Sequence, residues 1–271
     1  MGDAAPDLSA DFAAMVDPEP PEAAPVAPPD DPWLARRRHG FGASEMALVL
    51  VALGYRSADI LSSAQQKRNT QPRRKGIPRT HRVFLEKAGL VAPIKVNRDP
   101  GSPVQLGSER EPLLVASWKH KIRRGTAGPD CALLDWRTVT YVEGDWPREV
   151  LPLVDRMAPR LTATPDVLVR DIMGDLGCWD AKCSVHPYGE LREHHRIQLH
   201  AQMAVCCGEH GGIVEGEGWG AAFRDHAGEP MGPIVSRGCD REEELIRELR
   251  AAATEGWARV VEARSEWEKM Q

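Results

Sequence analysis

The fold is decided by the segment Ala163-Thr164-Pro165-Asp166 and by Asp180-Ala181-Lys182, whose aspartate follows Asp166 by fourteen positions. Side chains alternate along a strand, so Asp180 and Lys182 share one face and their apolar neighbours share the other. Pro165 cannot continue a strand ladder, so it predicts a break that aims Asp166 toward the neighbouring strand. We expect the apolar face to pack against a helix, which leaves a carboxylate and an ammonium group side by side where a ligand can reach them.

Two aspartates that are brought together repel each other unless a cation lies between them. Hard oxygen ligands such as Asp166 and Asp180 suit Mg²⁺ or Mn²⁺, and such an ion polarises a phosphoryl oxygen and activates a bound water. Lys182 can orient that water and offset negative charge on the phosphate. The pattern predicts metal-assisted phosphodiester hydrolysis, and the alternative is an aspartate at a strand edge beside a surface salt bridge.

Strand and helix signals alternate along the rest of the chain. Apolar spacing predicts a short helix that begins near Ser44 and stops at Gly54, and a long C-terminal helix after a capping-box pattern at Asp240 and Glu243. Further helices are expected at 111–124 and 190–207, and strands at 132–142, 161–170, 178–185 and 212–217. These signals predict an α/β (α+β) fold in which a central mixed β-sheet is flanked by helices.

Charge is distributed unevenly along the 271 residues, whose formal net charge is −5. Residues 1–32 hold eight acidic residues, no Lys or Arg, and many prolines, so we expect a disordered acidic Pro/Ala-rich tail before a single folded domain at 33–271. Residues 33–98 hold fourteen basic residues against three acidic ones, which suggests a polyanionic partner. Within this block, Arg73, Arg74 and Lys75 lie in a predicted loop that either contacts phosphate or is a solvated surface segment.

Several protein classes are excluded or disfavoured by composition. No apolar run approaches the length that spans a bilayer, and no secretory signal pattern is present, so we expect no membrane association and a cytoplasmic location. The six cysteines form no CxxC pair, which argues against a zinc ribbon or an iron–sulfur cluster. His194, His195 and His200 do not follow the HExxH arrangement, and we expect them at the surface.

Further blocks extend the pattern over most of the chain. Upstream of the two aspartate segments stand Trp33, Arg37 and Gly42-Ala43-Ser44-Glu45, and then Gly107 with Glu111-Pro112 four residues on; downstream stand Gln198 and Gln202-Met203-Ala204-Val205. In order and rough spacing these blocks resemble the YqaJ-type viral recombinases, the phage lambda exonuclease-like family of PD-(D/E)XK nucleases. Two departures concern the site: Asp180 stands where Glu is commoner, and Val167 stands where Gly is usual.

The resemblance implies a restriction-endonuclease-like PD-(D/E)XK core and a role for each matching residue. It implies that Asp166 and Asp180 ligate Mg²⁺ or Mn²⁺, that Lys182 assists the nucleophilic water, and that Glu111 completes the acidic site. Gln198 is implied to lie beside them on the following helix. Arg37 and Ser44 are implied to bind the 5′-terminal phosphate of DNA, in keeping with the affinity of a guanidinium and a helix-terminal hydroxyl for phosphate oxygens.

The implied activity is a metal-dependent DNA exonuclease that degrades one strand of a duplex from its 5′ end and leaves a 3′ single-stranded tail. A single-strand annealing protein is the implied partner in phage-type recombination, and a homo-oligomeric ring around DNA is a property of some members. Two alternatives remain open. One is an endonuclease or RecB-like nuclease with the same site, and the other is a non-catalytic DNA-binding module that keeps the fold.

Overall fold

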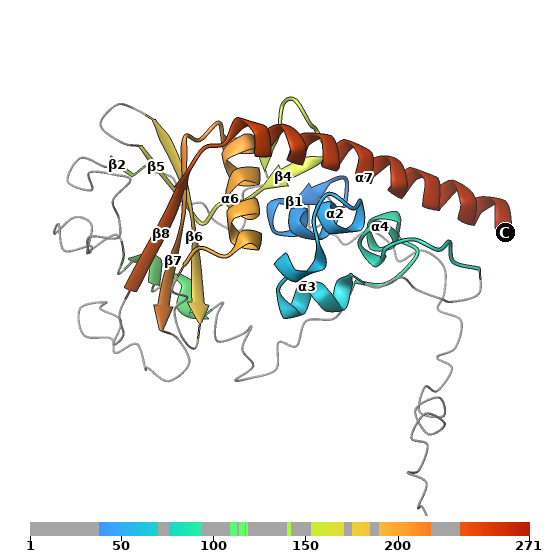
Figure 1. Ribbon diagram of the computed structural model, residues 1–271, viewed down its shortest axis with the longest axis horizontal. Helices are drawn as coiled ribbons and strands as arrows, with labels where there is room; N and C mark the ends of the chain where they lie inside the picture. Colours follow the sequence, from blue (N-terminus) through green and yellow to red (C-terminus); the bar gives the residue numbers. More distant parts are fainter. Residues whose placement is uncertain are drawn as a thin grey trace, which may run out of the picture.

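The computed structural model describes residues 38–69, 76–93, 109–112, 114–116, 118, 140–141, 153–170, 175–184, 190–217 and 234–271 (Figure 1). The predicted tail at 1–32, Arg37, and the predicted basic loop residues Arg73, Arg74 and Lys75 lie outside the described residues. Within the described part of the chain, no helix has the length and apolar character needed to cross a membrane.

A five-stranded mixed sheet carries both aspartate segments. Its strand order is β2-β5-β6-β7-β8, in which β6 and β7 run parallel and all other neighbours are antiparallel. The central strand β6 is the longest and contains the Asp180-Ala181-Lys182 segment. The bounds are Thr140–Tyr141 for β2, Val167–Arg170 for β5, Leu176–Ser184 for β6, His210–Glu217 for β7 and Ile234–Asp240 for β8.

A smaller sheet has the strand order β1-β4-β3 and packs with the helices. Its strands are β1 (Phe41–Gly42), β3 (Leu153–Val154) and β4 (Leu161–Ala163), and β4 pairs with β1 in parallel. The helices are η1 (Ala43–Glu45), α2 (Met46–Ala52), η2 (Ala58–Ile60), α3 (Ser63–Arg68), α4 (Arg82–Ala88), α6 (Glu193–Cys206) and α7 (Glu243–Met270).

Helix α6 forms the layer between the large sheet and the other helices, and α7 runs along the helical side of the molecule (Figure 1). The main apolar core lies on this side of the sheet and joins Phe41, the buried residues of α2 and α4, and the inward faces of α6 and α7. Gly256 allows α7 to approach closely, because a Cβ there would lie 3.1 Å from Phe41. Burial of this continuous core therefore sets the position of α6 against the sheet.

A second apolar cluster covers the opposite face of the large sheet. The described residues between 109 and 118 are helical, and the rings of Trp118 and Trp179 lie 5.0 Å apart. Gly216 faces the same helix, because a Cβ there would meet Leu114 at 2.8 Å. The prediction that the Trp179 face of β6 packs against a helix is therefore confirmed in the structure.

The mixed, helix-flanked architecture confirms the predicted fold class. The predicted break at Pro165 is also present, because β4 ends at Ala163 and β5 begins at Val167. The short helix stops as expected: Gly54 follows the C-cap with φ +82, a conformation that glycine adopts without a Cβ clash. The capping-box prediction was wrong, because Asp240 ends β8 and Glu242 is the N-cap of α7.

Candidate active site

Asp166 occupies the break between β4 and β5, where it is tied to the central strand. Its backbone N–H donates to the carbonyl of Trp179 at 3.1 Å, which extends the ladder by one bond beyond β5. Its side-chain Oδ2 accepts a 2.8 Å hydrogen bond from the backbone N–H of Ala181. The carboxylate therefore takes the place that a backbone carbonyl would fill if the strand continued through Pro165.

Asp180 is the centre of a side-chain network on the α6 side of β6. Its Oδ2 accepts from the Lys182 ammonium at 2.9 Å and from the side-chain amide of Gln198. Its Oδ1 accepts from Nε2 of Gln202 at 2.6 Å. Every donor is a strand neighbour or a residue on the inner face of α6, so the packing of this helix determines the environment of the carboxylate.

The sequence predicts that Asp180 and Lys182 are both accessible to a ligand, but only Lys182 is. Asp180 is 2% exposed, whereas the Lys182 side chain is 35% exposed. Alternation along β6 correctly separates the two faces, but α6 covers the polar face close to Asp180. A ligand therefore reaches Asp180 from the Lys182 and Asp166 side.

The electrostatics of the site are dominated by unfavourable negative charge on Asp166. Burial, together with the negative charges of Asp180 and Glu111 and against the lowering effect of Lys182, raises the pKa of Asp166 to about 8. Burial opposes the charge on Lys182, but the charges of Asp180 and Asp166 together raise its pKa well above the ordinary value. The site therefore holds an ammonium group beside two neighbouring carboxylates, and the charge of Lys182 offsets only part of the effect that burial and Asp180 have on Asp166.

Two further glutamates lie around this centre. Glu111 lies in the helix on the other side of the sheet, whose described part includes Glu109, and its charge acts on both Asp166 and Lys182. Glu215 is 3% exposed and lies opposite Lys182 in the parallel register of β6 and β7. The sequence analysis missed Glu215, and the only signal available was its place in a predicted strand.

Gln198 and Gln202 lie four residues apart, one turn of α6, and both side chains reach Asp180. The sequence analysis placed Gln198 beside the acidic residues, and the structure brings the two together. It assigned no role to Gln202, although residues at i and i+4 share a helix face. The helical spacing was the signal that could have identified the second glutamine.

The surface location expected for the three histidines of α6 was wrong for His200 and holds only in part for His194 and His195. His200 is 0% exposed, and its Nδ1 lies 2.8 Å from the carbonyl of Arg196. The rings of His194 and His195 lie 4.2 Å apart in the first turn of the helix, where both are half-buried. Burial, followed by the charges of His194 and Lys182, lowers the pKa of His195 to about 3, so this side chain is neutral beside the site.

Ser44 is exposed in η1, which packs against α6. The next residue, Glu45, is 6% exposed and anchors the turn: its Oε2 accepts from the Gly42 backbone N–H at 2.9 Å and pairs with Lys87 at 2.7 Å. Its Oε1 pairs with Arg68 at 3.1 Å. The implied partner of Ser44, Arg37, lies outside the described residues, so their joint phosphate site stays a prediction.

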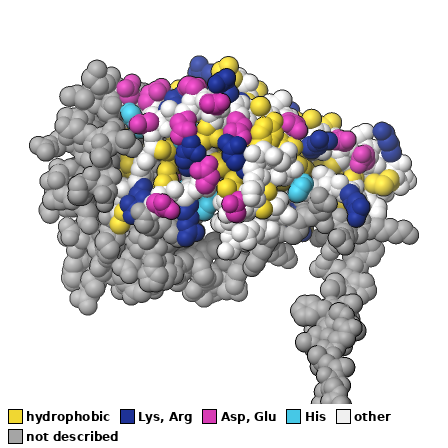
Figure 2. All heavy atoms as spheres, in the orientation of Figure 1, with side chains coloured by type: hydrophobic (Ala, Val, Ile, Leu, Met, Phe, Trp, Pro, Cys, Tyr) yellow, Lys and Arg dark blue, Asp and Glu magenta, His cyan; other side chains and the backbone are white. Residues whose placement is uncertain are grey.

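Acidic and basic side chains are interspersed on the face drawn in Figure 2, where they form no patch of one sign. Ion pairs link several of them, including Arg196 with Glu193 and with Glu242. On this face, the described residues therefore do not form the basic patch that the sequence predicts as a DNA contact.

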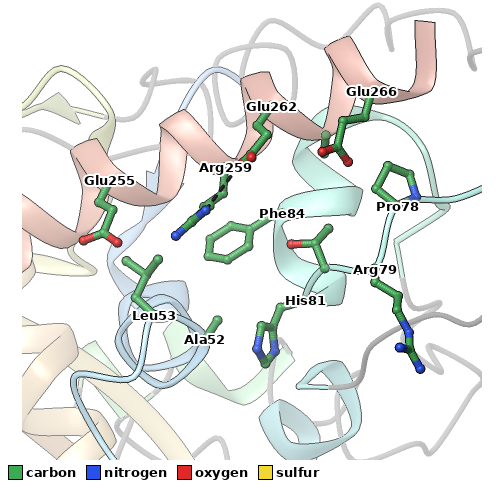
Figure 3. A pocket seen from close by; sticks show the side chains of 12 residues that line it. Ala52, Leu53, Pro78, Arg79, His81, Phe84, Glu255, Arg259, Glu262 and Glu266 are labelled. Carbon is green, nitrogen blue, oxygen red and sulfur yellow. Dashed lines mark hydrogen bonds and ion pairs between the residues drawn. The ribbon is translucent and has the colours of Figure 1, made fainter. Parts of the chain in front are cut away.

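A pocket of about 300 Å³ lies between α2, α4 and α7, apart from the aspartates (Figure 3). Phe84 and Leu53 supply apolar walls, and the α7 side is lined by Glu255, Arg259, Glu262 and Glu266. None of the residues predicted for the site lines this pocket. The candidate site is therefore the polar network around Asp166, Asp180 and Lys182.

Comparison of the sequence with protein-family models and with curated proteins gave no match. Comparison of the fold with solved structures did give matches. One is an alkaline exonuclease (LHK-Exo) from Laribacter hongkongensis, with a TM-score of 0.52 and 18% identity over 88% of this chain and 94% of that chain. The structure of LHK-Exo in complex with dAMP matches over the same shares with a TM-score of 0.50 and 18% identity.

A phage-related exonuclease from Haemophilus somnus 129PT matches at 14% identity over 85% of this chain and 94% of that chain, with a TM-score of 0.45. The similarity to LHK-Exo extends over nearly the whole of both chains, and it shows a shared exonuclease-type fold at low sequence identity.

Proposed function

We propose that this protein is a metal-dependent DNA exonuclease of the PD-(D/E)XK class. The observation that carries the proposal is the convergence of Asp166, Asp180 and Lys182 at the break between β4 and β5. The fold shared with LHK-Exo supports it. The same three residue types, held on adjacent strands, suit hydrolysis of a phosphodiester.

The donor set fits Mg²⁺ or Mn²⁺. Both carboxylates supply hard oxygen atoms, and a cation between them would relieve the repulsion that raises the pKa of Asp166. No group of three or more His, Cys, Asp or Glu side chains in the described ranges is arranged to hold a metal ion. The protein would therefore contribute two carboxylates, with water and substrate oxygens as the remaining ligands, which is a common arrangement for Mg²⁺.

Each side chain of the site has a defined part in this reaction. When bound, a divalent ion would polarise a phosphoryl oxygen of the substrate and activate a water molecule. Lys182 holds its positive charge beside the carboxylates and stabilises negative charge that develops on the phosphate. Gln198 donates to the same carboxylate oxygen as Lys182, so both donors lie on the Oδ2 side of Asp180.

Digestion of linear and closed circular duplex DNA with Mg²⁺ tests the exonuclease proposal. We expect linear DNA to be degraded and closed circles to remain intact, whereas cutting of circles would favour the endonuclease or RecB-like alternative. Asp180→Asn should abolish degradation, while the matched change Asp59→Asn at an exposed residue should not. An Asp180→Asn protein as active as the parent would favour a non-catalytic DNA-binding module with a contaminating nuclease.

The resemblance to the YqaJ-type viral recombinases supports a finer proposal. We propose digestion from the 5′ end to leave a 3′ single-stranded tail, which an annealing protein then binds in recombination. Release of label from 5′-labelled ends before 3′-labelled ends is expected, and the reverse order contradicts the polarity. We also propose that several copies of the protein form a ring around DNA. Light scattering of the full-length protein measures the number of copies.

Recognition of the 5′-phosphate by Arg37 and Ser44, and of the DNA backbone by Arg73, Arg74 and Lys75, is also proposed. Removing the terminal phosphate from the duplex should slow digestion by the parent but not by Ser44→Ala. Neutralising the three basic loop residues together should weaken DNA binding and reduce its salt dependence. An unchanged salt slope would identify the loop as a solvated segment.

A further inference from the structure

Asp180 accepts hydrogen bonds from three side chains that differ in their freedom to move. The two donors to Oδ2 are Lys182, whose side chain is 35% exposed, and Gln198, which is half-buried. The donor to Oδ1 is Gln202, which is 1% exposed and lies 2.6 Å away. The two oxygens of one carboxylate are therefore held in different ways.

The orientation of the Gln202 amide is fixed by its partner. An ionised carboxylate paired with an ammonium group only accepts hydrogen bonds, so the NH₂ group of Gln202 must face Asp180. Its Oε1 then points away and is buried without a hydrogen-bond partner among the described residues. Burial of an unpartnered carbonyl oxygen opposes folding, so it offsets part of the stability that the hydrogen bond to Asp180 contributes.

We infer that Gln202 is the fixed positioning residue for Asp180, whereas Lys182 and Gln198 are exchangeable donors that leave Oδ2 when a divalent cation binds. This inference rests on the proposed function. A cation at Oδ2 needs the lone pairs that Lys182 and Gln198 occupy, and the ammonium group also repels it. Lys182 can swing away on its flexible stem.

Gln202 has no such freedom, because the α6 face that carries it is closed by the main core. Its hydrogen bond to Oδ1 therefore persists and keeps the plane of the carboxylate set while the partners of Oδ2 change. Hydrogen bonds that orient a ligating carboxylate in this way affect metal affinity by about ten- to a hundredfold. The inference thus predicts opposite effects for two glutamines that contact the same side chain.

Titration of the full-length protein with Mn²⁺ in a calorimeter, without DNA, tests this difference. Gln202→Met keeps the length of the side chain and removes the donor, and we expect Mn²⁺ affinity to fall by about tenfold or more. Gln198→Met is the matched control on the same helix and the same carboxylate. It should leave Mn²⁺ affinity unchanged or raise it, because it removes a competitor for Oδ2.

Thermal unfolding of the same samples separates positioning from a structural role. Gln202→Met removes both the unpartnered oxygen and the donor to Asp180, whose effects on stability oppose each other, so the variant should still unfold well above the temperature of the titration. If that variant does not fold, Gln202→Asn, which draws the amide back by one methylene, should show the same loss of affinity.

Parent-like Mn²⁺ affinity in either folded Gln202 variant overturns the inference, and so does an equal loss in Gln198→Met. Failure of both Gln202 variants to fold assigns this residue a structural role and also overturns it. A parent protein that binds no Mn²⁺ overturns the proposed metal-dependent function itself, which distinguishes the two failures.

Discussion

Oδ2 of Asp166 accepts a 2.8 Å hydrogen bond from the backbone N–H of Ala181, so the first carboxylate of the site is tied to the strand that carries the second. This bond fixes the position of Asp166 but does not remove its repulsion with Asp180. Burial and that repulsion together raise the pKa of Asp166 to about 8. The backbone therefore fixes the position of Asp166, but the repulsion between Asp166 and Asp180 remains.

The first prediction concerns the pH dependence of stability in the metal-free protein. A carboxyl whose pKa is raised on folding binds its proton more tightly in the folded state. Its contribution to stability is therefore complete below about pH 4 and is lost as pH rises through about 8. In EDTA, the melting temperature should fall between pH 5 and pH 9, and Asp166→Asn should flatten this part of the curve. A parent-like slope in the variant would contradict the assignment to Asp166.

The second prediction concerns Lys182→Met. The positive charge of Lys182 lowers the pKa of Asp166, so its removal should move the pH-dependent loss of stability to higher pH. Nuclease activity with Mg²⁺ should fall by about a hundredfold or more, because charge developing on the phosphate loses its stabilising ammonium. Melting curves and digestion rates measure the two effects. Lys269→Met, at the exposed end of α7, is the control and should change neither.

The shared face of Asp180 and Lys182 on β6 could be predicted, because the alternation of side chains along a strand is a local property. Alternation along a strand places Asp180 and Lys182 on one face from the sequence alone, and the structure agrees. What covers that face depends on the packing of α6, which is set by residues far away in the sequence. The burial of Asp180 and His200 was therefore missed, and so was Gln202, although all three follow from one helix position.

The strand β8 shows a second limit. Its run Ile234–Asp240 contains a serine, an arginine and a glycine, so it carries no clear alternation, and pairing with β7 defines it instead. The break at Pro165 was easier to predict, because the missing backbone N–H acts at a single residue. The break at Pro165 thus followed from one residue, whereas β8 followed only from its pairing with β7.

The third prediction links the second apolar cluster to the site. A Cβ added at Gly212 would lie 2.1 Å from the indole of Trp179, which is 2% exposed and packs on Trp118. Gly212→Ala should therefore displace the indole and lower the free energy of unfolding by about 1–3 kcal/mol. Because Asp180 follows Trp179 directly, digestion should slow as well.

Denaturant unfolding measures this effect, and a second substitution tests its cause. Trp179→Leu removes the ring that the new methyl group meets, so the double variant should lose less free energy than the sum of the two single changes. Additive losses would show that the clash with Trp179 is not the reason for the destabilisation.

The last prediction concerns Glu45, which is 6% exposed and joins Lys87, Arg68 and the backbone of Gly42. Glu45→Gln keeps an acceptor for the Gly42 N–H but removes the negative charge that Lys87 and Arg68 share, while Arg68 keeps its 2.7 Å pair with Glu86. Loss of one partner from a buried ion pair costs about 3–5 kcal/mol, so a decrease of this size in the free energy of unfolding is expected.

Glu262→Gln on α7 is the matched control for Glu45→Gln. Its pair with Arg259 is exposed, so the same charge removal should change stability by less than about 1 kcal/mol. Urea titrations of both variants at two salt concentrations make the comparison, and only the exposed pair should weaken with added salt. If the two glutamates prove equally dispensable, the Glu45 cluster does not hold η1 in place, and the position of the adjacent Ser44 must be fixed by the hydrogen bond from Gln65 to its carbonyl.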